Sequence, residues 1–334
     1  MDKITILGAG AFGFALAKII SDNNHDKNIF LFDVQEDFIN HIHTTRKHPI
    51  FHKDKELSHH VTATTNLKDA VNDSDIIILA IPSKFLRSAI IDFKKYLKDG
   101  VILMNVAKGL EFKTNMRISQ VIEESLKDFN YNFCCLSGGM IAKEVILGNP
   151  LCANLACKNL SIANNVAKII SNDKFRIEIS DDVIGVELAG AFKNVVAIGA
   201  GIFDGLGFGE SSKSAFISSC SREISELAVV LGADRKTFGS GSQAWFGDLM
   251  TTCFGESRNR EYGELVGKNI NPKEALDLMI KDNKSVEGFI TTEVVYNLLK
   301  KHNLESNLLF NIYNVLYNNL SPEDFINNFI KSTF

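Results

Sequence analysis

A short apolar segment near the start of the chain runs directly into a glycine-rich turn, and this feature limits the fold more than any other. Residues 3–7 are mainly apolar or β-branched, and the turn Gly8-Ala9-Gly10-Ala11-Phe12-Gly13 follows at once. The apolar segment 14–20 then predicts a largely buried helix. A strand, a glycine turn and a helix in this order are typical of the phosphate-binding turn of dinucleotide-binding domains.

Each glycine of the turn has its own expected function. Gly8 permits the tight turn, Gly10 lets the backbone approach a pyrophosphate, and Gly13 lets helix and strand pack closely. The helix would offer free N–H groups and a partial positive charge to the phosphates. A second strand, 28–32, ends at Asp33, which is spaced as expected for a carboxylate that binds the adenosine ribose. The alternative is a glycine turn with an unrelated acid, and the surrounding pattern favours the nucleotide site.

The first half of the chain alternates between strand and helix patterns. Further apolar runs lie at 75–82, 101–106 and 132–136, with helical segments between them, notably 84–97 and 114–129. Such runs suit parallel strands that are buried on both faces. We therefore expect an α/β fold, with a Rossmann-type doubly wound sheet forming a dinucleotide-binding domain over residues 1–180.

The second half shows only helix patterns, so an all-α substrate-binding domain is expected over residues 181–334. Ser180-Asp181-Asp182 offers side-chain oxygens that can cap a helix start, and 183–203 is almost entirely apolar and small. Pro272 and Pro322 sit where a helix start tolerates the missing N–H. The later segments that predict helices are 213–231, 258–267, 272–281, 288–301 and 305–317.

Composition and charge exclude several classes of function. The formal net charge is −4 and no basic stripe is present, so no nucleic-acid partner is expected. The six cysteines form no CxxC pair, so no metal site is expected. We find no secretory signal and no uninterrupted apolar run of roughly 18 residues, the length that a membrane span needs. These features predict a cytoplasmic protein without a membrane partner.

Lys193 is the most unusual residue in the apolar segment 183–203, where only Glu187, Lys193 and Asn194 are strongly polar. Burying a lysine costs several kcal/mol unless the charge is paired or neutralised. Two interpretations remain open. The side chain reaches the surface along its apolar stem, or it is a desolvated lysine with a lowered pKa that transfers a proton. Glycines within the segment are expected where another backbone or a ligand approaches closely.

The segment Ser257-Arg258-Asn259-Arg260 opens a predicted helix. Ser257 is a plausible N-cap, which puts Arg258 and Asn259 in the first turn. The helix dipole disfavours an arginine there unless an anion is bound, and a guanidinium binds phosphate through two hydrogen bonds. The alternative is a solvated, charged helix start.

Over nearly the whole chain, these and other motifs resemble NAD(P)-dependent glycerol-3-phosphate dehydrogenase of the bacterial soluble type. The motifs include the glycine turn, Ile81-Pro82-Ser83, Ala107-Lys108-Gly109-Leu110-Glu111, Ala142-Lys143-Glu144, Lys193-Asn194, Asp204-Gly205-Leu206-Gly207-Phe208-Gly209, Gly247-Asp248-Leu249, Ser257-Arg258-Asn259-Arg260 and Val286-Glu287-Gly288. The resemblance implies an enzyme that interconverts dihydroxyacetone phosphate and sn-glycerol 3-phosphate with NAD(P)H, supplying glycerol 3-phosphate for phospholipid synthesis. It also suggests a homodimer.

The resemblance also implies roles for individual residues. The catalytic residues implied are Lys193, Lys108 and Asp248. The cofactor contacts implied are Gly8, Gly10, Ala11, Phe12, Gly13, Asp33, Lys108, Ala142, Arg258 and Glu287. The contacts implied with a small phosphorylated polyol substrate are Lys108, Gly138, Lys193, Asn194, Asp248, Ser257, Arg258 and Asn259.

Two segments depart from the family pattern. Ser137-Gly138-Gly139-Met140-Ile141-Ala142 has Met140 where the family usually has a hydroxyl, and Ala244-Trp245-Phe246 replaces smaller residues. Both are expected near the substrate, which leaves open a dehydrogenase of the same fold that acts on a different phosphorylated hydroxy compound. A regulatory nucleotide-binding protein without catalysis is the alternative from another class, and the joint presence of Lys108, Lys193 and Asp248 argues against it.

Asp33 also bears on the choice of cofactor. The next arginine along the chain is Arg46, so no guanidinium is close in sequence to receive a 2′-phosphate. A carboxylate can accept hydrogen bonds from both ribose hydroxyls of NADH, whereas it would repel the extra phosphate of NADPH. We therefore expect NAD as the cofactor, with NADH preferred over NADPH.

Overall fold

The computed structural model describes residues 1–111 and 114–333, and the chain forms two compact units. The first unit comprises Met1–Glu111 and Met116–Val186, and the second comprises mainly Glu187–Phe334. The division falls inside the long helix α8 (Val183–Gly205), shortly after the boundary that the sequence patterns suggest.

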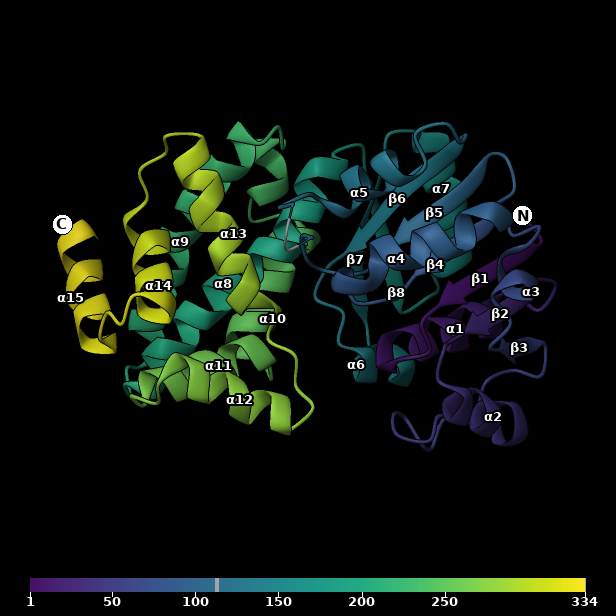
Figure 1. The fold of residues 1–334 in the computed structure, drawn as a ribbon, viewed down its shortest axis with the longest axis horizontal. Helices are drawn as coiled ribbons and strands as arrows, with labels where there is room; N and C mark the ends of the chain where they lie inside the picture. The colour runs from purple at the N-terminus through teal and green to yellow at the C-terminus, as the bar shows by residue number, and fades with distance from the viewer. Residues whose placement is uncertain (112–113, 334) are drawn as a thin grey trace. The chain divides into compact units, whose positions relative to one another are not determined.

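Within the described residues, the first unit contains one eight-stranded sheet with helices on both faces (Figure 1). The strand order is β3-β2-β1-β4-β5-β6-β7-β8, and all neighbours are parallel except β6 and β7. The first six strands have the order of dinucleotide-binding sheets, which confirms the predicted Rossmann-type fold. The strands are β1 (Lys3–Leu7), β2 (Asn28–Phe32), β3 (Val61–Thr64), β4 (Ile76–Leu79), β5 (Val101–Asn105), β6 (Tyr131–Ser137), β7 (Leu151–Cys157) and β8 (Phe175–Ser180).

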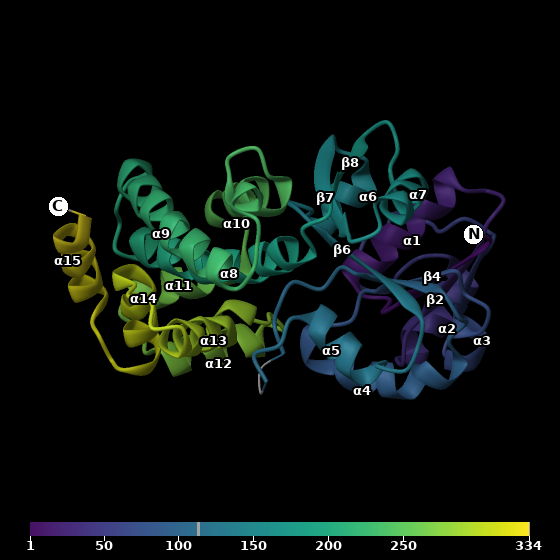
Figure 2. The same ribbon diagram turned by 90° about the horizontal axis from the view of Figure 1, so that it is seen from above.

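Helices cover the two faces of this sheet, as Figure 2 shows. One face packs against α1 (Ala11–Asn23), α6 (Ala142–Leu147) and α7 (Leu160–Ile170), and the other packs against α3 (Leu67–Val71), α4 (Ser83–Phe93) and α5 (Ile118–Ser125). Strand β1 contributes Ile4 and Ile6 to the first core and Leu7 to the second, because successive side chains in a strand point to opposite faces. Helix α2 (Glu36–Thr45) follows β2.

Two predicted helices of this unit are shorter than expected. Segment 84–97 forms α4 and then the short 3₁₀ helix η1 (Lys94–Tyr96), and segment 114–129 contributes only α5. Helix α5 begins after Arg117, whose backbone N–H donates to the Gln120 side chain, and its C-cap is Leu126.

The described part of the second unit contains helices and connecting loops but no strands, which confirms the predicted all-helical region. It contains α9 (Glu210–Val230), α10 (Asp248–Phe254), α11 (Arg258–Gly267), α12 (Pro272–Lys281), α13 (Glu287–Lys301), α14 (Asn307–Tyr317) and α15 (Pro322–Thr333), with the short helices η2 (Arg235–Phe238) and η3 (Gln243–Gly247). The expected helix starts are present, because the Asp182 carboxylate accepts from Gly185 N–H at 2.9 Å and both prolines occupy first helical positions.

Helix α8 forms the core of the second unit, with α9, α11 and α13 around it in both views (Figures 1 and 2). It is long and apolar enough to cross a membrane, but 94% of its most apolar window is buried inside the structure. A Cβ atom added at Gly201 would overlap the carbonyl oxygen of Arg260, and one added at Gly263 would overlap that of Ile198. The glycines of α8 therefore allow the α11 backbone to approach closely, as expected.

Candidate active site

The glycine turn joins β1 to α1 and has room for a phosphate. Gly8 has a φ of +106°, and a Cβ there would lie 2.5 Å from the carbonyl oxygen of Ala80. A Cβ at Gly13 would overlap the carbonyl oxygen of Gly8, whereas one at Gly10 would meet nothing within 4 Å. Gly10 is the N-cap of α1 and no side chain caps the helix there. The first N–H groups of α1, on Ala11 and Phe12, thus fit a pyrophosphate.

Asp33 turns toward this glycine turn. Its Oδ2 accepts a hydrogen bond from Ala9 N–H at 2.7 Å, and its Oδ1 accepts one from Gln35 N–H at 3.0 Å. An ionised carboxylate has about four acceptor positions, so capacity remains for ribose hydroxyls. The Arg46 guanidinium is engaged elsewhere, because it donates to the carbonyl oxygens of Val61 (3.0 Å), Leu57 (3.4 Å) and Ser58.

Lys108 lies in the loop after β5, and its Nζ donates to the carbonyl oxygen of Gly138 at 2.6 Å. The loop is held from α4, because Arg87 donates two hydrogen bonds of 2.7 Å to the Glu111 carboxylate. Ala142, a predicted cofactor contact, is the first residue of α6. The structure therefore brings Lys108 and Gly138 together within the first unit.

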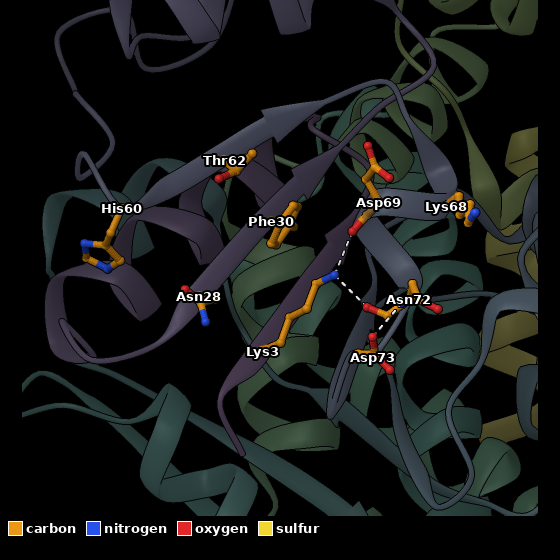
Figure 3. A pocket seen from close by; sticks show the side chains of 9 residues that line it. All are labelled: Lys3, Asn28, Phe30, His60, Thr62, Lys68, Asp69, Asn72 and Asp73. Carbon is orange, nitrogen blue, oxygen red and sulfur yellow. Dashed lines mark hydrogen bonds between the residues drawn. The ribbon is translucent and has the colours of Figure 1, made fainter.

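A hollow of about 450 Å³ opens at the amino ends of strands β1 and β2, opposite the end that carries the glycine turn (Figure 3). It is lined by β1, β2, β3 and α3, and includes Lys3 and Asn28, the first residues of their strands. Lys3 Nζ donates to the carbonyl oxygens of Asp69 and Asn72, both at 2.6 Å. Ligands of such sheets bind beyond the carboxyl ends of the strands, so this hollow is not part of the candidate site.

In the second unit, Lys193 on α8 is buried and paired. Its Nζ donates to Asp248 Oδ1 at 2.7 Å and to Thr252 Oγ1 at 2.6 Å. Lys193 is 7% exposed and Asp248 is 1% exposed. The interpretation of Lys193 as a surface lysine is therefore wrong. A buried ammonium group is tolerated when a carboxylate and further hydrogen bonds surround it.

Thr252 is a member of this group that the sequence reasoning missed. It follows Asp248 by four residues on α10, so both side chains lie on one helix face. Its hydroxyl donates to the backbone carbonyl oxygen of Asp248 at 2.6 Å and so presents a lone pair to Lys193. The four-residue spacing was the signal that could have identified it.

Asn194, Asn259 and Gly288 form a second buried group. Gly288 N–H donates to Asn259 Oδ1 at 2.8 Å, so the Asn259 amide nitrogen must be the donor to Asn194 Oδ1 at 3.0 Å. This chain of bonds leaves Asn194 Nδ2 buried without a hydrogen-bond partner among the described residues. A buried, unpaired N–H donor is unfavourable, which marks this point as the place of a missing acceptor.

The start of α11 lies beside this group. Ser257 caps the helix, as predicted, by accepting from Arg260 N–H at 3.5 Å. Arg258 is exposed, and its Nη1 donates to Ser285 Oγ at 3.1 Å. Glu287 is the first residue of α13, immediately before Gly288.

The two departures from the family pattern contribute to apolar packing. Met140 belongs to the buried core of the first unit. Trp245 is 1% exposed, its ring lies 5.0 Å from that of Phe238, and its Nε1 donates to Ser221 Oγ at 2.9 Å. Phe246, in contrast, is partly exposed. Among residues 1–111 and 114–333, no three His, Cys, Asp or Glu side chains form a group that could hold a metal ion.

The strand order, the open phosphate-binding turn and a buried lysine in a separate helical unit are the combination expected of nicotinamide-dependent dehydrogenases. Models of NAD-dependent glycerol-3-phosphate dehydrogenase match the chain, the N-terminal one over residues 3–163 and the C-terminal one over residues 182–327. The chain belongs to this family, as the sequence motifs predict.

Individual relatives from this family are similar to the chain over nearly its whole length. The chain is 37% identical to glycerol-3-phosphate dehydrogenase (NAD(P)+) of Fusobacterium nucleatum, covering 98% of this chain and 96% of the relative. It is 35% identical to the enzyme of the same name from Staphylococcus carnosus, covering 95% and 94%. The crystal structure of glycerol-3-phosphate dehydrogenase from Coxiella burnetii is similar with a TM-score of 0.89 and 27% identity, covering 98% of both chains.

Proposed function

We propose that this protein is an NAD(P)-dependent oxidoreductase that interconverts dihydroxyacetone phosphate and sn-glycerol 3-phosphate, and that it supplies glycerol 3-phosphate for phospholipid synthesis in the cytoplasm. The observation that carries the proposal is the buried group of Lys193, Asp248 and Thr252. A buried ammonium in an apolar helix lowers stability relative to an ordinary core residue even when a carboxylate and a hydroxyl accept its hydrogen bonds, which supports a chemical role.

Lys193 acts as the general acid and base at the substrate oxygen. Asp248 and Thr252 take two of its three ammonium protons, so the third is directed at the C2 oxygen of the substrate. In the reducing direction Lys193 donates this proton as the ketone becomes an alcohol, and in the oxidising direction it removes it. Asp248 holds the ammonium in place and balances its charge. Lys108 is a further substrate contact, as the family resemblance implies.

The substrate phosphate binds at the start of α11. Asn194 Nδ2 is the buried donor that needs an acceptor, and a phosphate oxygen supplies one. Three further groups at this helix start favour an anion. Arg258 contributes a guanidinium, Asn259 contributes an amide, and Ser257 caps the N-terminus of the helix. Gly138 adds a backbone contact. Holding the phosphate fixes the substrate carbonyl relative to Lys193.

The dinucleotide binds to the first unit, and when bound it supplies or accepts the hydride. Gly8, Gly10, Ala11, Phe12 and Gly13 form the pyrophosphate turn, and the adenosine ribose binds Asp33. Because Asp33 faces the turn while Arg46 is engaged by three carbonyl oxygens, NADH is preferred over NADPH. Further cofactor contacts are made by Ala142, Arg258 and Glu287. The active form of the enzyme is a homodimer.

The proposal is tested by following NADH oxidation with a panel of phosphorylated ketoses, keto acids and unphosphorylated dihydroxyacetone. We expect dihydroxyacetone phosphate to give the highest kcat/KM and dihydroxyacetone to be poor, because it lacks the phosphate. Arg258→Lys should raise KM for dihydroxyacetone phosphate, since a point charge replaces a two-point contact. If the enzyme clearly prefers another phosphorylated hydroxy compound, the proposed substrate is wrong, but the proposed reaction type still holds.

A further inference from the structure

A cluster of charged side chains outside the proposed catalytic group joins three helices of the second unit. Asp204, near the end of α8, accepts from Lys213 Nζ on α9 at 2.8 Å and from Arg260 Nη1 on α11 at 2.7 Å. Each cation is bonded to a different carboxylate oxygen. The Lys213 side chain is only 4% exposed, and its ion pairs with Asp204 and Glu210 offset the cost of burying the charge.

Arg260 links the Asp204 carboxylate to the turn that precedes α11. Its Nε donates to the carbonyl oxygen of Gly255 at 3.0 Å, and Gly255 is the C-cap of α10. The turn 255–257 thus has a fixed point at its start. At its other end Ser257 caps α11 and the proposed phosphate-binding residues follow.

The geometry of the guanidinium couples these two contacts. The group is planar and rigid, so fixing Nη1 on Asp204 also fixes the direction in which Nε points. The charge of Arg260 in the first turn of α11 is also opposed by the helix dipole. A second carboxylate, that of Glu264, lies farther from Nη1, at 3.8 Å. Without Asp204 the guanidinium would turn toward Glu264 or toward an anion bound at the helix start, and its bond to Gly255 would be lost.

We infer that Asp204 is a positioning residue for phosphate recognition. Through Arg260 it holds the turn 255–257 in the conformation that presents Arg258 and Asn259 to the substrate phosphate. The inference rests on the proposed function. Asp204 touches none of the reacting atoms, so its effect falls on the binding of the phosphate and leaves proton transfer at Lys193 unchanged.

The test compares Asp204→Asn with the parent enzyme at saturating NADH. We expect KM for dihydroxyacetone phosphate to rise about tenfold, the scale of one lost hydrogen bond to a charged group, with kcat within about twofold. The kcat/KM for unphosphorylated dihydroxyacetone should not change, whereas a general structural defect would lower both. Glu210→Gln is the matched control, because Glu210 contacts Lys213 at 3.1 Å from an exposed position on α9.

Arg260→Lys is the second variant and decides the question if Asp204→Asn does not fold. It keeps the positive charge beside Asp204 but removes the Nε–H bond to Gly255, so it should raise KM by a similar factor. An unchanged KM in the folded variants, or a parallel loss with both substrates, overturns the inference. A parent enzyme that fails to reduce dihydroxyacetone phosphate contradicts the proposed function itself, which distinguishes the two failures.

Discussion

A single lysine in an apolar helix was the strongest chemical signal in this chain, and its neighbours decide what it can do. Lys193 lies where an unpaired charge would be strongly unfavourable, yet Asp248 and Thr252 saturate two of its three protons. The two hydrogen bonds fix the direction in which the Lys193 amino group points. A residue of this kind is expected to affect turnover far more than binding of the dinucleotide.

The first prediction concerns this residue. Lys193→Ala should lower kcat by at least roughly 100-fold, the scale of a lost general acid, while the Kd for NADH stays near the parent value. Stopped-flow or steady-state NADH oxidation measures the first quantity and fluorescence titration the second. Lys268→Ala is a suitable control, since Lys268 is an exposed lysine paired with Glu264 on α11. Near-normal turnover in a folded Lys193→Ala protein would remove the lysine from the mechanism.

The second prediction concerns Asp33 and the choice of cofactor. The parent enzyme should show a kcat/KM for NADH at least roughly tenfold above that for NADPH, about 1.4 kcal/mol, because a carboxylate repels the 2′-phosphate. Asp33→Ser should narrow this gap, mainly by improving NADPH, while its hydroxyl can still accept from Ala9 N–H. Equal kcat/KM values for the two cofactors in the parent would refute the role given to Asp33.

Sequence reasoning reached some site residues and not others for physical reasons. The glycine turn and Ser257 were predictable because their functions are local, within one turn of chain. The partner of Lys193 is Asp248, 55 residues away, and only the family resemblance named it in advance. The free donor on Asn194 depends on a chain of three hydrogen-bonded groups, which no spacing in the sequence reveals.

At the scale of helices and strands, the predictable elements were those with a clear cap, a proline or a continuous apolar run in the sequence. The helices 258–267 and 272–281 have the predicted bounds, because a cap or a proline marks each start. Strands β7 and β8 were not predicted, since many of their side chains are only partly buried and their pattern is weaker. Strand β7 pairs antiparallel with β6 and β8 pairs parallel with β7, so the two strands extend the sheet beyond β6.

The third prediction concerns the contact between α8 and α11. Gly201→Ala should lower the free energy of unfolding even though alanine favours a helix by about 1 kcal/mol, because the added methyl group overlaps backbone atoms of Arg260 that cannot turn aside. Chemical denaturation measures the change. Gly241→Ala is the control, since a Cβ there meets nothing within 4 Å. If the two variants have the same free energy of unfolding, α8 and α11 can move apart without a loss of stability, and the prediction is wrong.

At the scale of the whole molecule, one carboxyl links the start of the chain to the sheet and makes stability depend on pH. Burial alone would raise the pKa of Asp75, but hydrogen bonds from Lys98 and from the N–H groups of Asp2 and Lys3 lower it from 3.8 to about 2. Because the pKa is lower in the folded state, this contribution is present above pH 4 and is lost as pH falls toward 2.

The fourth prediction follows from that sign. Asp75→Asn should be less stable than the parent near neutral pH, and the difference should shrink as the pH falls from about 4 to about 2. Melting temperatures of the two proteins across this range provide the measurement. A difference that stays constant down to pH 2 would show that Asp75 contributes through packing and not through its charge.

The close approach of α8 and α11 also restricts how this chain can change over generations. A side chain that grows in a protein core is often rescued by a smaller neighbour, but at Gly201 and Gly263 the opposing atoms are carbonyl oxygens of the other helix. No substitution makes a backbone smaller, so no second-site change on the facing helix can restore the fit. A genetic selection for suppressors of Gly201→Ala should therefore return revertants to glycine and few compensating changes on α11.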